Sequence, residues 1–278
     1  APRMPPPSMT SAIRDPAGLS RRASATGWSM GALYLQAMLS ALGWGTLAAS
    51  SLIIGALLAF VRKWPDRQVG LVLAFGAGAL ISAVSFELAE EGIAVGSLGS
   101  TAIGLGLGAI TYYLLDGVVT RRSSNKTGRA GRTDSDDPGT ALALGAFLDG
   151  IPEQFVLGIG LAAGQGVGIG LLVAIFVSNL PEAIGSADDM RESGTGKTKV
   201  IGLWCAVAAV CVLATLAGYG IADSVSGQLR AAIDGFAAGA LLVMLIDSMI
   251  PEASKAAGRS AGLLATLGFA LATALSSI

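Results

Sequence analysis

The chain has 278 residues, of which 53% are hydrophobic and 13% are charged, and it contains 39 glycines. Charged residues make up about a quarter of an average soluble domain, so this composition excludes an ordinary soluble enzyme and is typical of a protein with several membrane spans. The formal net charge is −1 and histidine is absent, which excludes a broad basic surface for nucleic acid, His-dependent catalysis and His-containing metal sites.

The N-terminal segment 1–30 is rich in proline and serine and is expected to be a disordered tail before a membrane domain at 31–278. Eight apolar segments follow, each long enough to cross about 30 Å of hydrocarbon. They are predicted at 41–61, 69–88, 96–115, 141–162, 166–187, 200–221, 235–250 and 261–278. The polar segment 120–140 is expected to be a flexible cytoplasmic loop. The sequence therefore predicts an all-α membrane protein with eight transmembrane helices.

Lysine and arginine are concentrated in alternate loops. The first, third, fifth and seventh loops carry thirteen basic residues, whereas the other three carry only Arg230. Because basic loops stay in the cytoplasm, the odd-numbered loops are expected there and both termini outside. Four arginines in the N-terminal tail oppose this orientation, but they lie at least 19 residues before the first predicted span. The expected location is the bacterial inner (plasma) membrane.

A short motif, F-x-A-G-A-L, occurs twice, at 75–80 and 236–241, an offset of 161 residues. Sixteen residues after each phenylalanine comes a glutamate, Glu91 in the first copy and Glu252 in the second. In the expected topology the second span runs outward and the seventh inward, so the copies would be inverted, as in many transporters. The sequence thus predicts an inverted repeat of three, two and three spans.

The fourth and fifth spans each carry a proline followed by a glutamate, in D-G-I-P-E at 149–153 and S-N-L-P-E at 178–182. A carboxylate deep in the bilayer is costly unless it is paired, hydrated or bound to a cation. Pro152 and Pro181 are expected to kink their helices and to free the carbonyl four residues earlier. Asp149, Glu153 and Glu182 then predict an all-oxygen site for a divalent cation. The alternative is that the prolines only mark kinks, with protonated glutamates bonded to neighbouring helices.

Other acidic residues lie near the ends of predicted spans. Four of them flank the cytoplasmic ends of spans five and seven and could line an exit path or be surface charges: Asp188, Asp189, Asp247 and Glu252. Four more lie where they can reach water and are expected to be solvated: Glu87, Glu91, Asp116 and Asp234. Ser178 and Gln154 are polar residues of a type that usually joins transmembrane helices.

These features resemble the ZIP family (Zrt- and Irt-like proteins) of divalent metal transporters, whose fourth span carries an H-N-x-P-E-G-like motif and whose fifth carries a related P-E-G-like motif. Here D-G-I-P-E-Q at 149–154 and S-N-L-P-E-A at 178–183 occupy those places. The eight spans, the long third cytoplasmic loop and the I-P-E end of span seven also fit. The resemblance implies transport of zinc, manganese, iron or a similar cation toward the cytoplasm, by movement of one helix bundle. The metal ion would be the substrate, with no prosthetic group.

The resemblance also implies roles for five residues. Glu153 and Glu182 would be shared ligands, Asp149 a first-site ligand, and Ser178 and Asn179 weaker ligands. Asp149 replaces the family's histidine, and the sixth span has no acidic residue. We therefore expect one site with harder ligands than is usual in the family. Small-residue helix faces would also allow a homodimer in the lipid bilayer.

Two other functions are alternatives to transport. A metal-sensing or regulatory membrane protein would keep the same carboxylates, and the sequence does not separate it from a transporter. The segment D-G-V-V-T-R at 116–121 resembles the core of CDP-alcohol phosphatidyltransferases, which are membrane enzymes. That core needs four spaced aspartates, and only Asp116 and Asp134 are present. The chain is therefore not expected to be an enzyme.

Overall fold

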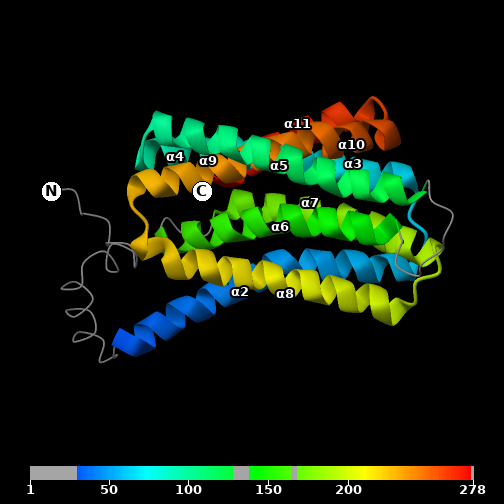
Figure 1. Cartoon of the computed structure of the whole chain (residues 1–278), viewed down its shortest axis with the longest axis horizontal. Coiled ribbons are helices and arrows are strands. Elements are labelled where there is room, and N and C mark those ends of the chain that lie inside the picture. The colour runs from blue at the N-terminus through cyan, green and yellow to red at the C-terminus, as the bar shows by residue number, and fades with distance from the viewer. Residues whose placement is uncertain (1–29, 128–137, 164–167, 277–278) are drawn as a thin grey trace.

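The computed structural model describes residues 30–127, 138–163 and 168–276, and these residues form an all-helical fold (Figure 1). The helices are α2 (Met30–Val61), α3 (Asp66–Ser82), η1 (Ala83–Glu90), α4 (Glu91–Val95), α5 (Leu98–Thr127), α6 (Pro138–Ala163), α7 (Ile169–Glu192), α8 (Lys197–Ile221), η2 (Ala222–Ser224), α9 (Gly227–Met244), η3 (Leu245–Met249), α10 (Ile250–Ala257) and α11 (Ser260–Ser276). Because α3–η1–α4 and α9–η3–α10 are each continuous, the described residues form eight long helical segments.

Six of these segments are long and apolar enough to cross a membrane: 35–61, 66–95, 98–117, 169–192, 197–221 and 227–257. The apolar helices at 150–162 and 260–276 are shorter. The prediction of an all-helical integral membrane protein is therefore confirmed. Helix α2 begins eleven residues before the predicted span. The segment 120–140, expected to be a loop, is helical at both ends, because α5 continues to residue 127 and α6 begins at residue 138. The predicted tail up to residue 29 and the segment 128–137 lie outside the described residues.

The helices form two groups. Helices α2, α6, α7 and α8 pack on one another, while α3 packs on α11 and α5 packs on α9. Helix α7 also contacts α3 and α11, which joins the two groups. Figure 1 shows the turns after α2, α7 and α10 at one end of the molecule and the turns after α4 and α8 at the other. We call the second end the α4 end.

The two helix pairs of the second group approach very closely. A Cβ atom added to Gly78 of α3 would lie 1.8 Å from the carbonyl oxygen of Ala265 in α11, and one added to Gly268 would lie 2.0 Å from that of Phe75. Only glycine allows such backbone contact. In an apolar bilayer the hydrophobic effect does not drive helices together, so the dispersion energy of this close contact stabilises the pair.

Helices α5 and α9 meet in the same way. A Cβ atom on Gly239 would lie 2.0 Å from the Leu105 carbonyl oxygen, and one on Gly108 would lie 1.9 Å from the Phe236 carbonyl oxygen. Phe75 and Phe236 are the first residues of the two motif copies, and Gly78 and Gly239 are the fourth. The same motif positions therefore make the contacts of α3 with α11 and of α9 with α5.

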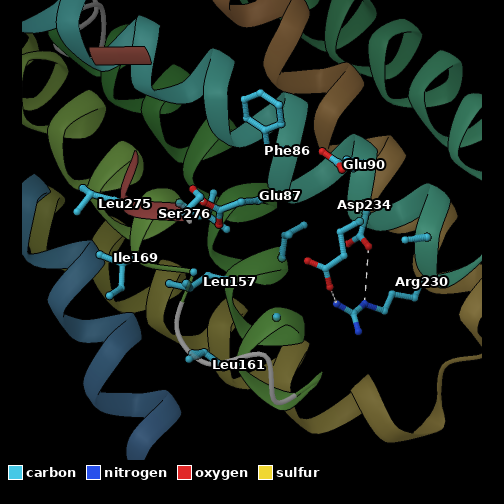
Figure 2. A pocket seen from close by; sticks show the side chains of 16 residues that line it. Phe86, Glu87, Glu90, Leu157, Leu161, Ile169, Arg230, Asp234, Leu275 and Ser276 are labelled. Atoms are coloured by element: carbon cyan, nitrogen blue, oxygen red, sulfur yellow. Dashed lines mark hydrogen bonds and ion pairs between the residues drawn. The ribbon is translucent and has the colours of Figure 1, made fainter. Parts of the chain in front are cut away.

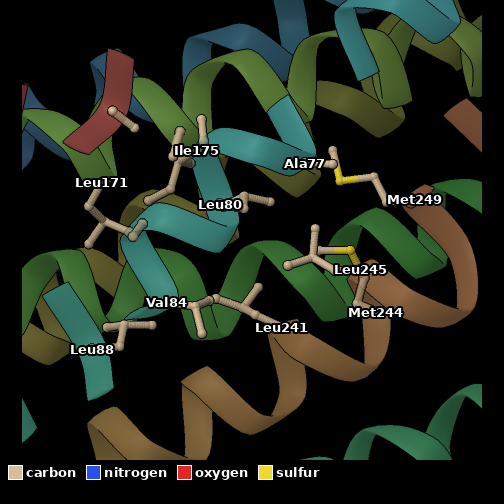
Figure 3. Packing of buried hydrophobic residues seen from close by; sticks show 14 of the residues in the cluster. Ala77, Leu80, Val84, Leu88, Leu171, Ile175, Leu241, Met244, Leu245 and Met249 are labelled. Carbon is tan, nitrogen blue, oxygen red and sulfur yellow. The ribbon is translucent and has the colours of Figure 1, made fainter. Parts of the chain in front are cut away.

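A cluster of buried apolar residues fills the space between α3, η1, α7, α9 and η3 (Figure 3). Leu80, Ile175 and Leu241 are among its fully buried members. Two π-helical segments adjoin this cluster, η1 in the first motif copy and η3 in the second. A π-helical turn inserts an extra residue and is common at functional sites. In a regular α-helix, Pro251, which follows η3, would clash with the carbonyl of Asp247. This clash explains why η3 departs from α-helical geometry.

Candidate metal site

The two proline–glutamate motifs lie inside α6 and α7, which contact each other. Both helices continue through their prolines. Pro152 and Pro181 have no N–H, so the carbonyl oxygens of Leu148 and Val177 lose their α-helical partner. The two motifs therefore bring oxygen atoms and acidic side chains to neighbouring segments in the middle of two helices.

The polar side chains of these motifs are buried. The exposed fractions are 1% for Glu153, 1% for Ser178 and 2% for Asn179, while Glu182 is half-buried. Ser178 Oγ donates a hydrogen bond of 3.1 Å to the Ile175 carbonyl oxygen in its own helix. The Asn179 Nδ2 atom has no hydrogen-bond partner among the described residues. Burial of a glutamate and an amide at this depth is costly and marks a functional site by default.

Gln154, next to Glu153, joins two helices. Thr215 Oγ1 of α8 donates a hydrogen bond of 2.6 Å to Gln154 Oε1, and both side chains are fully buried. The contact confirms the interpretation of Gln154 as a residue that holds helices together. It also fixes the part of α6 that carries Glu153 against α8, where the Glu153 carboxylate lies near Cys211.

Small residues on neighbouring helices surround the α7 motif. A Cβ atom on Gly76 of α3 would lie 2.9 Å from the Ser178 Cα atom, and one on Gly55 of α2 would lie 2.6 Å from the Leu180 carbonyl oxygen. Helix α7 is therefore held on two sides by close backbone contact at the motif. This contact fixes the position of Ser178 and Asn179 without using other polar side chains.

Two statements about metal ligands follow from the described side chains. The backbone of Asp149 lies in α6, but its side chain is outside the described ones. Among the side chains that are described, no group of three or more His, Cys, Asp or Glu residues could hold a metal ion. The predicted ligand set, which includes Asp149, therefore stays a prediction.

The four predicted pathway residues have different surroundings. Asp188 forms an ion pair with Arg191 in the same helix. Asp189 of α7 and Glu252 of α10 are exposed and interact electrostatically, so the structure brings these two together from distant parts of the chain. Asp247 is exposed in η3.

The expectation that Asp234 is solvated is wrong. Its exposed fraction is 2%, and Arg230 Nε lies 3.7 Å from Asp234 Oδ2. Arg230 also forms an ion pair with Glu91, across from α9 to α4. The sequence contained one signal for the first contact, since residues four apart on a helix lie on the same face. The second contact joins residues 139 positions apart, so no local pattern could reveal it.

These charged residues line a cavity of about 490 Å³ at the α4 end (Figure 2). Glu87, which was also expected to be solvated, is half-buried there and accepts a hydrogen bond of 2.5 Å from Ser276 Oγ. The wall nearest the α6 motif is apolar and includes Val156 and Leu157, which begin three residues after Glu153. No local sequence pattern reveals this cavity, because its lining comes from five separate parts of the chain.

Comparison with known proteins gives one informative similarity. No family model matches the chain. The "Putative zinc transporter" of Arabidopsis thaliana is 28% identical to it over 242 residues, which are 84% of this chain and 38% of that protein. The chain thus spans well under half of its relative's length. The chain is a distant homologue of this Arabidopsis protein, which is consistent with membership of the ZIP family.

Proposed function

We propose that the chain transports a divalent metal cation, zinc or a related ion such as manganese or iron, through a carboxylate site formed by α6 and α7. The observation that carries this proposal is the burial of Glu153 inside α6 of a membrane protein, together with the burial of Ser178 and Asn179 on α7, a helix that contacts α6. An ionised carboxylate in such a place needs a cation or a proton. The only basic residue on α6 or α7 is Arg191, in the last turn of α7.

The ligands would be oxygen atoms. Glu153 and Glu182 serve as the shared ligands and Asp149 as a further carboxylate ligand, with Ser178 and Asn179 completing the shell more weakly. Asn179 carries a carbonyl oxygen that suits a hard cation, and its buried Nδ2 atom has no hydrogen-bond partner among the described residues. Carboxylate and amide oxygens without imidazole or thiolate favour manganese or magnesium on softness grounds, although zinc also accepts carboxylates.

The proposed membrane arrangement is eight transmembrane helices at 31–278, in an inverted repeat of three, two and three spans. Matching contacts support it, because Phe75 meets Gly268 in the first pair as Phe236 meets Gly108 in the second. Gly78 of the first copy contacts Ala265, which lies three residues before Gly268. Gly239 of the second copy contacts Leu105, which lies three residues before Gly108. The π-helical segments η1 and η3 also lie at overlapping positions once the offset of 161 residues is applied.

We propose that the end opposite the α4 end faces the cytoplasm, with both termini outside. The turns after α2, α7 and α10 lie at that end, and basic residues lie in or next to each of them, whereas Arg230 is the basic residue near the turns after α4 and α8, which supports this orientation. Transport would run toward the cytoplasm. Asp189 and Glu252, which interact at that end, would receive the released cation.

The two helix groups would move relative to each other during transport. Helices α2, α6, α7 and α8 carry the site, and α3 contacts α7 directly at Gly76 and Ser178. A smooth interface of small residues permits sliding with less rearrangement of side chains than an interface of long ones. A moving bundle of this kind would expose the site first to one end and then to the other.

Uptake into proteoliposomes tests the proposal. The full chain is reconstituted, and uptake of Zn²⁺, Mn²⁺, Fe²⁺, Co²⁺, Cd²⁺ and Mg²⁺ is measured for the wild type and for Glu153→Gln and Glu182→Gln. Glu192→Gln is the matched control, because Glu192 lies on the same helix as Glu182 but is exposed and paired with Lys63. We expect saturable uptake of at least one cation, a loss of more than about tenfold in the first two variants, and no change in the control.

Two results would contradict the proposal. Equal losses in all three variants would show that the effect is not specific to the buried site. Binding of a cation without uptake, in protein that is folded and inserted, would instead favour a metal sensor that keeps the same carboxylates.

A further inference from the structure

The cavity at the α4 end contains a single basic side chain. Arg230 lies on its wall together with four carboxylates, those of Glu87, Glu90, Glu91 and Asp234. The guanidinium interacts with two of them, Glu91 of α4 and Asp234 of α9 (Figure 2). When all are ionised, carboxylates exceed cations by three in this lining. In that state the lining would attract cations even with Arg230 in place.

Arg230 is built into the cavity wall. Its exposed fraction is 8%, and Asp234 is buried to 2%. The Nε atom of Arg230 and the Oδ2 atom of Asp234 are buried without a hydrogen-bond partner among the described residues, and they face each other at 3.7 Å. A guanidinium removed from water to this extent is costly unless carboxylates compensate for it. Its position is thus set by Glu91 and Asp234.

The cavity lies next to the proposed metal site. Val156 and Leu157 of α6 form part of its wall and lie one turn beyond Glu153 in the same helix. If a divalent cation approaches Glu153 from the α4 end along α6, it passes this cavity. Free carboxylates there would bind the ion tightly and hold it before it reached Glu153, because two close carboxylates in a site of low dielectric attract a double charge strongly.

We propose that Arg230 sets how tightly the cavity holds divalent cations during the proposed transport reaction, because its guanidinium occupies Glu91 and Asp234 as a tethered counter-cation. The cavity then concentrates divalent cations through Glu87 and Glu90 without retaining them. This inference rests on the proposed function for its effect on transport. Its effect on cation binding in the cavity does not depend on transport.

Zinc binding to the purified full chain in detergent is the first measurement. Glu153→Gln/Glu182→Gln serves as the background, so that the central site does not contribute to the calorimetric signal. In this background Arg230→Gln is expected to bind Zn²⁺ about tenfold more tightly, because a positive charge a few ångströms from the ion is lost. Arg230→Lys, which keeps the charge, is expected to bind as the background does.

Variants that preserve the charge balance distinguish electrostatics from a folding defect. Arg230→Gln/Glu91→Gln removes one charge of each sign, and Glu91→Arg/Arg230→Glu exchanges the partners. Both are expected to bind Zn²⁺ within about twofold of the background. The control Lys63→Gln removes an exposed ion pair near the opposite end and is expected to leave binding unchanged.

Uptake is the second measurement, made with intact Glu153 and Glu182. Arg230→Gln is expected to lower both KM and kcat for Zn²⁺ severalfold, since the ion is held in the cavity. Unchanged Zn²⁺ affinity in Arg230→Gln, or an equal change in Arg230→Lys, would overturn the role of Arg230. Absence of uptake in every variant, with the binding pattern as expected, would overturn the proposed function while supporting the counter-cation in the cavity.

Discussion

Replacing Gly108 by alanine is expected to separate α5 from α9. The added Cβ atom would lie 1.9 Å from the carbonyl oxygen of Phe236, 2.7 Å from its carbonyl carbon and 2.9 Å from its Cα atom. All three are backbone atoms, so no side-chain rotation relieves the contact. Since real Cβ atoms keep at least 3.0 Å, the helices must move apart locally by about 1.1 Å, the difference between 3.0 and 1.9.

The cost of this separation exceeds the gain from a better helix-forming residue. Overpacking typically costs about 1–3 kcal/mol, whereas alanine gains at most about 1 kcal/mol over glycine in helix propensity. The same interface is also tight at Gly104, whose added Cβ would lie 2.1 Å from the Ala232 carbonyl oxygen, so the separation weakens a second contact. The two magnitudes leave a net loss of about 0–2 kcal/mol, and the second contact places the expected value in the upper half of that range.

Thermal unfolding in detergent measures this loss. Gly106→Ala is the matched control, because Gly106 lies on the same helix and has nothing within 4 Å of its added Cβ. Gly268→Ala tests the internal duplication, since its contact with Phe75 matches that of Gly108 with Phe236 and should cost a similar amount. If Gly108→Ala unfolded at the same temperature as Gly106→Ala, the reasoning from close backbone contact would be refuted.

Two further variants have expected outcomes. Thr215→Val leaves the buried Gln154 Oε1 without its 2.6 Å hydrogen bond and should lower the free energy of unfolding by about 1–3 kcal/mol in the same assay. Thr215→Ser keeps the hydroxyl and should not lower it. Equal stability of the two variants would argue against the hydrogen bond. Lys63→Gln should leave the unfolding temperature and uptake unchanged, because its ion pair with Glu192 is exposed and exposed pairs contribute little. The hydrogen bond between them raises the pKa of Lys63 and lowers the pKa of Glu192. The pair is lost as pH rises through the Lys63 pKa or falls through the Glu192 pKa, so unfolding at neutral pH compares the intact pair with its absence.

The error at Asp234 has a physical cause. Its position near the end of an apolar segment predicts contact with water, but a position along a helix does not reveal which face a neighbouring helix covers. Asp234 is buried because α4 and α5 pack against α9. The π-helical segments were also missed, since η1 contains no proline and depends on its packing in the apolar cluster.

The sequence by itself determined that the chain is a helical membrane protein, because an apolar segment of sufficient length favours a helix in lipid independently of its neighbours. It also located the proline–glutamate motifs on α6 and α7, since a buried carboxylate beside a proline is a local pattern. Only the tertiary structure decided that Arg230 meets Glu91 and that Phe75 meets Gly268. Lipid is as apolar as the helices themselves, so helix pairing depends on how closely two particular surfaces fit, and that fit joins residues far apart in the chain.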